Sequence, residues 1–236
     1  MPERTSASDW RPARLDLLIS ALVALGFPSL AGFLLGKVGA LVPMLLYYGA
    51  AWGVSILRRG SSGYGLRGLV PPPASFYANT GVIIATLVFA ALASEKTACS
   101  SLAGVLLTAV FWAPLNAASE QLLWLYIFDS WDRFGAARFK RAGRAAMRIA
   151  ALGFFALFVG TIHTMFWAKF LKTVDPASFF GVAFILGTTV SGFLHIVVWR
   201  TSGRMIYTFI PHFLLNLAPL AWTGYSMLPY LFAPTP

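Results

Sequence analysis

Charged residues are scarce in this chain of 236 residues, at 11%, whereas 58% of its residues are hydrophobic. An average soluble domain is about 25% charged and about 45–50% apolar. A soluble fold of this length has too little interior to hide so much apolar surface. Disorder is excluded as well, because disordered chains have low hydrophobicity. The composition therefore predicts an integral membrane protein.

Cysteine and acidic residues are also rare. The single cysteine, Cys99, excludes an internal disulfide and a cysteine-based metal site. Only 8 acidic residues oppose 18 Lys and Arg, which gives a net charge of +10. In a soluble protein this excess would indicate a nucleic-acid partner. In a membrane protein it reflects topology, because cytoplasmic loops collect Lys and Arg, so no nucleic-acid partner is expected.

The sequence contains several long runs of apolar residues. A helix needs roughly 20 mostly apolar residues to cross a bilayer, and each run should be helical because lipid offers no partner for exposed backbone groups. The first run is too long for the core of a cleaved signal peptide, so it is expected to remain as a helix. The fold class predicted is an all-α polytopic membrane bundle of about seven transmembrane helices. The seven predicted spans are 17–36, 38–57, 76–94, 101–128, 149–171, 179–199 and 205–232.

The basic residues predict the orientation of these spans. With the N-terminus inside and the C-terminus outside, 14 of the 18 Lys and Arg lie on the cytoplasmic side, as the positive-inside rule requires. A multi-pass protein of the plasma (inner) membrane is therefore expected. The inner set is Arg4, Arg11, Arg14, Arg58, Arg59, Arg67, Arg133, Arg138, Lys140, Arg141, Arg144, Arg148, Arg200 and Arg204, and the outer set is Lys37, Lys96, Lys169 and Lys172.

Two parts of one membrane domain are distinguished: an N-terminal three-helix region over 1–100 and a four-helix core over 101–236. The longest polar stretches are 58–75, an irregular loop with glycines and three consecutive prolines, and 129–148, a basic helical stretch. The second is predicted to be a solvated cytoplasmic loop that contacts the anionic headgroups of membrane lipids. The sequence predicts no oligomeric state.

A few ionisable side chains lie inside the predicted spans, where a charge costs at least ~2.5 kcal/mol. A rise of 1.5 Å per residue places Glu120 about 12 Å from the cytoplasmic end of its span, His163 about 21 Å, His212 about 10 Å and Asn216 about 16 Å. His195 lies at roughly 6 Å. The first four residues, from three helices, therefore fall in one layer, whereas His195 is expected to be a wet interfacial histidine or to have a peripheral role at a site.

The spacing of these residues adds to the pattern. Asn216 follows His212 by four residues, and Glu120 follows Asn116 by four, so each pair shares a helix face. Pro114 is predicted to kink its span and open a wet cavity. A carboxylate, two imidazoles and an amide are suited to activating water and stabilising an oxyanion. Hydrogen bonding between helices and proton transport are alternative roles for the same side chains.

The stretch 191–217 resembles the last motif of the CPBP intramembrane proteases, which include the type II CAAX prenyl endopeptidases and bacterial Abi proteins. A helix rich in small residues and an Arg-Thr-Ser-Gly turn precede His212 and Asn216, which match the family's His-x-x-x-Asn. In the first motif, Glu-Glu-x-x-x-Arg, Glu120 matches the first glutamate, whereas Gln121 and Leu125 replace the second glutamate and the arginine. Since both partners of that ion pair are replaced, no orphan charge remains, which favours an active, divergent protease.

The second family motif, Phe-x-x-x-His, is matched at His163, with Val159 in place of the phenylalanine. The resemblance implies an intramembrane endopeptidase with a cavity open to the cytoplasmic side and a peptide or protein substrate that need not be prenylated. Glu120 would activate water, His163 would orient it, and His212 with Asn216 would stabilise the oxyanion. Glu120, His163 and His212 could also hold a zinc ion with one open position, or act without metal.

Secondary site residues are Asn116, Gln121, Trp124 and His195. Trp124 lies one turn after Glu120, where it would wall the cavity or pack in the core, and Trp167 is assigned to the membrane interface or to packing. Two other functions are consistent with the same residues. One is a non-catalytic partner-binding or immunity protein of this fold, and the other is a small proton-coupled transporter, although no inverted repeat supports it.

Overall fold

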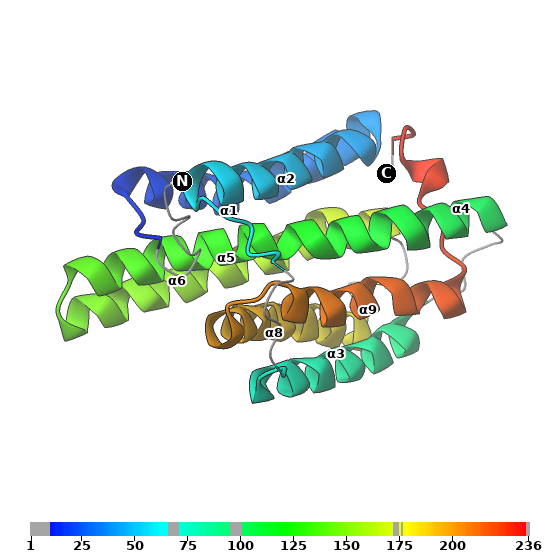
Figure 1. The fold of residues 1–236 in the computed structure, drawn as a ribbon. Coiled ribbons are helices and arrows are strands. Elements are labelled where there is room, and N and C mark those ends of the chain that lie inside the picture. The colour runs from blue at the N-terminus through cyan, green and yellow to red at the C-terminus, as the bar shows by residue number, and fades with distance from the viewer. Residues whose placement is uncertain (1–9, 66–70, 95–100, 172–174, 176, 235–236) are drawn as a thin grey trace.

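The chain was analysed as a computed structural model. Figure 1 shows a bundle of elongated helices lying side by side, and the described part of the chain contains no strand. Five residues that entered the predictions, Arg4, Arg67, Lys96, Cys99 and Lys172, lie outside the described residues. The described residues are 10–65, 71–94, 101–171, 175 and 177–234.

Seven helical segments form the bundle within the described residues, so the predicted all-α polytopic membrane fold is confirmed. Six are long and apolar enough to cross a membrane. Three of them are the single α-helices α1 (Arg14–Val38), α3 (Ala74–Ala93) and α8 (Phe179–Ser202). The other three contain a π-helical turn. In the first, α2 (Leu41–Gly53) continues into the turn Val54–Arg58; in the second, the turn Thr108–Trp112 joins α4 (Leu102–Leu107) to α5 (Ala113–Arg138); in the third, the turn His163–Trp167 joins α6 (Arg141–Ile162) to α7 (Ala168–Leu171). The seventh, α9 (Ile206–Thr223), has 18 residues and packs on α3, α5 and α8.

The last helix is shorter than the predicted span 205–232. It ends at Thr223 because Gly224 adopts a left-handed backbone conformation (φ 62°) that terminates the helix. The chain then forms the short 3-10 helix Leu228–Tyr230. Backbone hydrogen bonds join the end of this segment to the start of α2. The C-terminal residues of the predicted span therefore cap the bundle instead of extending α9.

The basic stretch 129–148 is helical, as expected, but it is no loop. Helix α5 continues to Arg138, and α6 begins at Arg141, so the two helices form a hairpin that projects beyond its neighbours (Figure 1). Their connection is only Phe139 and Lys140. The helices extend this far because Asp129 and Asp132, on the inner face of α5, form ion pairs with Arg148 of α6 and Arg200 of α8.

Helix α3 belongs by sequence to the N-terminal region, but it packs against α8 and α9 of the predicted core. The approach of α3 and α8 is close at Gly187, where a Cβ atom would overlap the Thr86 side chain. Thr86 is 1% exposed, and its hydroxyl donates to the Val82 carbonyl at 2.8 Å, so it has little room to move. A glycine at position 187 therefore permits the contact that places α3 beside the polar residues of α8 and α9.

We expect Gly187→Ala to lower the free energy of unfolding by about 1–3 kcal/mol, the usual cost of overpacking a core. Chemical unfolding in detergent, followed by circular dichroism, measures the change. Gly153→Ala in α6 is the matched control, because its Cβ would meet no atom within 4 Å and alanine favours a helix. Equal stability of the two variants would show that α3 and α8 can move apart to accommodate the added methyl group at no cost in free energy.

Candidate functional site

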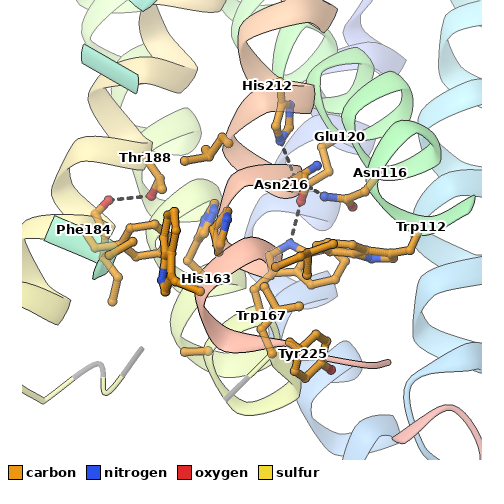
Figure 2. A pocket seen from close by; sticks show the side chains of 18 residues that line it. Trp112, Asn116, Glu120, His163, Trp167, Phe184, Thr188, His212, Asn216 and Tyr225 are labelled. Atoms are coloured by element: carbon orange, nitrogen blue, oxygen red, sulfur yellow. Dashed lines mark hydrogen bonds and ion pairs between the residues drawn. The ribbon is translucent and has the colours of Figure 1, made fainter. Parts of the chain in front are cut away.

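Glu120 lies in the middle of the bundle and is 2% exposed. Its Oε2 accepts a hydrogen bond from Asn116 Nδ2 at 3.0 Å and lies 3.1 Å from His212 Nε2. Its Oε1 accepts from Trp167 Nε1 at 2.6 Å. Figure 2 shows these three side chains converging on the carboxylate from α5, α9 and the π-helical turn after α6. The buried carboxylate is thus fully supplied with donors, as a group removed from water requires.

The N-terminal part of α5 holds the carboxylate in place. Asn116 lies one helical turn before Glu120, as the spacing predicted, and its Oδ1 accepts from Tyr48 of α2 at 3.0 Å. The amide therefore bridges Tyr48 and Glu120. The π-helical turn Thr108–Trp112 ends two residues before Pro114, which lies in the first turn of α5.

Helix α9 contributes two residues on one face. His212 is 1% exposed, and its ring stacks on Trp124 with centroids 5.0 Å apart and an interplanar angle of 20°. Asn216 lies one turn further along α9, is half-buried, and donates to the Ala113 carbonyl at 3.3 Å. Both side chains line the same cavity as Glu120, as predicted.

His163 begins the π-helical turn that ends at Trp167. Its Nδ1 lies 2.7 Å from the Val159 carbonyl. Because a carbonyl oxygen only accepts, Nδ1 carries the proton and Nε2 keeps its lone pair. The ring lines the cavity and points into it (Figure 2). The backbone of Val159 thus orients the imidazole.

A cavity of about 60 Å³ lies between these side chains and can hold a few water molecules. At one end it is polar, with Glu120 and the other three predicted catalytic residues. At the other end it is apolar, and its half-buried walls come from α7, α8 and α9. Those walls include Leu171, Phe184, Ile185, Pro219 and Trp222.

The half-buried walls lie toward one end of the bundle. Leu171 ends α7, Phe184 lies near the start of α8, and Trp222 lies near the end of α9. In the orientation predicted from the basic residues, this end is the extracytoplasmic one. The opposite end of the site is filled with packed aromatic and aliphatic side chains of residues 122–128.

Nowhere in the described part of the chain do three His, Cys, Asp or Glu side chains come together around a common point. Within the predicted ligand set, the Glu120 oxygens are already engaged by Asn116, Trp167 and His212. A zinc ion held by Glu120, His163 and His212 therefore stays a prediction from the sequence.

Two of the secondary residues have structural partners outside the cavity. Trp124 is 2% exposed, donates to Tyr47 OH at 3.2 Å and supports the His212 ring, so it belongs to the core. Gln121 Nε2 donates to Tyr64 OH at 2.8 Å and to the Ala117 carbonyl at 2.7 Å. Gln121 is thus an uncharged side chain held by hydrogen bonds beside Glu120.

The prediction of a wet, interfacial His195 is wrong. Its side chain is 1% exposed because α3 covers this part of α8. Nδ1 donates to the Ser191 carbonyl at 2.6 Å and lies 3.3 Å from the Asn79 amide. The ring centroid is 5.5 Å from that of His212, but His195 does not line the cavity.

Trp167 and a cluster of ion pairs were missed. Trp167 follows His163 by four residues, and this spacing could have placed its indole N–H beside the site. The ion pairs, here called the Asp129 cluster, lie where the helices reach the α5–α6 hairpin. The Asp129 cluster consists of Asp129, Asp132, Arg59, Arg133, Arg148 and Arg200.

Asp129 is fully buried at the centre of this cluster. It pairs with Arg200 and, at 3.1 Å, with Arg133, while Arg59 Nη2 lies 4.0 Å away. Arg59 is 2% exposed, and its guanidinium lies between the rings of Trp10 and Trp199. Burial lowers the pKa of Arg59, and the Asp129 carboxylate opposes this shift. The acidic residues inside the basic stretch were the available signal for such a cluster.

Comparisons of the chain with protein-family models, with curated proteins and with solved structures gave no match.

Proposed function

We propose that this protein is an intramembrane endopeptidase of the CPBP type that hydrolyses peptide bonds with water activated by Glu120. One observation carries the proposal: Glu120, His163, His212 and Asn216, from three different helical segments, line a single cavity large enough for water. The motif resemblance assigns roles to the same four residues. The contact between Glu120 and His212 supports those roles.

In the proposed reaction, a water molecule in the cavity donates a hydrogen bond to Glu120 and another to the lone pair of His163 Nε2. Glu120 removes a proton as the water oxygen attacks the carbonyl carbon of the substrate. The carbonyl oxygen becomes an oxyanion, which accepts hydrogen bonds from His212 Nε2–H and Asn216 Nδ2–H. Glu120 then passes its proton to the leaving nitrogen as the C–N bond breaks.

The surrounding side chains prepare Glu120 for this role. Trp167 and Asn116 donate to the carboxylate in the resting arrangement, and Tyr48 fixes Asn116 from α2. These contacts restrict the carboxylate to one position before substrate binds. Such preorganisation is a large part of catalytic efficiency, because the groups need not reorient during the reaction.

Replacing either proposed oxyanion donor tests the assignment. We expect His212→Ala and Asn216→Ala each to lower kcat by about 10²–10³-fold, the usual effect of losing one oxyanion donor. The assay uses purified protein in detergent and a panel of fluorogenic peptides. His195→Ala is the control, because this second buried histidine does not line the cavity, and its rate should stay within about threefold of the wild type. If the His212 and Asn216 variants are as active as the wild type, the oxyanion assignment is wrong.

Two other functions predict different results. A non-catalytic partner-binding or immunity protein would show no hydrolysis and would retain a stable partner after Glu120→Ala, as measured in pull-downs. A proton-coupled transporter would accumulate solute in proteoliposomes only under a proton gradient. The peptide assay therefore comes first, because hydrolysis that depends on Glu120 contradicts both alternatives.

A further inference from the structure

The proposed site is sealed toward the Asp129 cluster. Between Glu120 and Asp129 on α5, residues 122–128 are at most 3% exposed. Trp124 closes the space beside His212 by stacking on its ring. Trp199 of α8, 3% exposed, and Met205, fully buried, fill the same end of the bundle. The cavity at Glu120 and the hollow beside the α5–α6 hairpin share no lining residue.

The Asp129 cluster adds a polar layer to this seal. It ties α5 to α8 through Arg200, which pairs with both Asp129 and Asp132, and to α6 through Arg148, 2.8 Å from Asp132. Arg59 adds the segment that follows α2. Opening a path at this end would require breaking several of these ion pairs as well as displacing the hydrophobic layer.

At the other end, the wall of the cavity is partly exposed. Phe184 and Ile185 of α8, Pro219 and Trp222 of α9, and Leu171 of α7 line it and are half-buried. In Figure 2 the side chains of Trp112, Trp167 and Tyr225 lie on the side of Glu120 away from His212, and all three are buried. No ionisable Asp, Glu, Lys or Arg residue contributes to the lining on this side among the described residues.

The charges assign the two ends to the two sides of the membrane. The sealed end carries the Asp129 cluster and the exposed basic residues of the α5–α6 hairpin, including Lys140, Arg141 and Arg144. The open end has Lys37 and Lys169 as its described basic residues. Under the positive-inside rule, the sealed end faces the cytoplasm.

We propose that the site receives water and substrate from the extracytoplasmic half of the membrane, through a mouth between α7, α8 and α9. Its substrates would be polypeptides with an apolar segment in that half of the bilayer, because the mouth offers aliphatic and aromatic surface and no charge. A lipidated C-terminus on the cytoplasmic face would not reach Glu120. The identity of the substrate rests on the proposed peptidase function, whereas the position of the mouth does not.

Cysteine labelling locates the mouth without any need for catalysis. In a Cys99→Ser background, which removes the only native cysteine, Phe184→Cys and Ile185→Cys test the mouth, and Lys140→Cys marks the hairpin. Ser130→Cys, a nearly isosteric change at a fully buried position, tests the seal. A membrane-impermeant maleimide is added to intact cells or to inside-out vesicles.

We expect Phe184→Cys and Ile185→Cys to be labelled in intact cells, Lys140→Cys only in inside-out vesicles, and Ser130→Cys in neither. Labelling of the mouth variants only in inside-out vesicles, or from neither side, would overturn the proposal. Near-normal labelling of Ser130→Cys from inside would equally overturn it, because the seal would then be open to water.

A second measurement concerns the substrate. In proteoliposomes, labelled Phe184→Cys should lose at least about tenfold in the rate of hydrolysis of a membrane-inserted peptide, because the label fills the mouth. Labelled Lys140→Cys should keep its rate. Equal rates for the two labelled variants would overturn the assigned entry path. If the labelling pattern is as expected but the wild type cleaves no peptide, the peptidase function fails while the position of the mouth stands.

Discussion

Replacing Glu120 with glutamine lowers the rate of peptide hydrolysis by about 10²–10⁴-fold, the contribution expected of a general base. Glutamine keeps the shape of the side chain and still offers an oxygen to Trp167, whose indole N–H donates to Glu120 at 2.6 Å. It cannot remove a proton from water. The loss should therefore fall on kcat, and the affinity for substrate should change little, as steady-state kinetics with a fluorogenic peptide would show.

Asp132→Asn is the matched control, because it makes the same chemical change on the same helix, away from the cavity. Its kcat should stay within about threefold of the wild type, since no step of the proposed reaction involves it. Circular dichroism of both variants checks the fold. A folded Glu120→Gln variant with wild-type kcat would show that the carboxylate is structural and would remove the basis of the proposed mechanism.

Replacing Asp129 with alanine lowers the free energy of unfolding by about 3–5 kcal/mol, the cost of removing one partner from a buried ion pair. The variant leaves Arg59 without a nearby carboxylate, although its side chain is 1% exposed. It also removes one of the two carboxylates that Arg200 binds. Chemical unfolding in detergent, monitored by tryptophan fluorescence, measures the change.

Arg148→Ala provides the comparison, because it removes a member of the same cluster whose side chain is 58% exposed. An exposed pair contributes about 0–1 kcal/mol, so this variant should be several times less destabilised than Asp129→Ala. Similar losses for the two variants would contradict the view that burial gives the cluster its importance. Asp129→Asn should fall between them, because the amide keeps hydrogen-bonding capacity but loses the charge.

Most of the fold follows from the length of the apolar runs, because a membrane permits few alternatives to helices of about 20 residues. The ends of the helices were harder to predict. Helix α9 stops early at Gly224, which apolar composition does not reveal, and α5 runs past Phe128 because its polar residues find partners on other helices. Composition therefore predicts which segments are helical but not where polar segments join them.

Some features of the candidate site could likewise be predicted from the sequence, and others could not. The four-residue spacings of Asn116 with Glu120 and of His212 with Asn216 correctly predicted shared helix faces. The burial of His195 could not be predicted, because it depends on α3, which is distant in sequence and packs over it. The packing of the seven side chains at 122–128 beside the site could not be predicted for a related reason, since it depends on contacts with other helices.

The three π-helical turns have a consequence for how this protein can vary in sequence. Two of them, Thr108–Trp112 and His163–Trp167, lie in the helices that carry Glu120 and His163. A π-helical turn is an α-helix with one extra residue, and each residue of an α-helix turns the chain by about 100°. Deleting one residue from the turn Thr108–Trp112 would restore a regular α-helix and leave the segments on its two sides close to their present orientation. Deleting one residue between Trp112 and Glu120 would instead rotate Glu120 by about 100° against the preceding turns. Single-residue deletions near Glu120 should thus be better tolerated within this π-helical turn than after it.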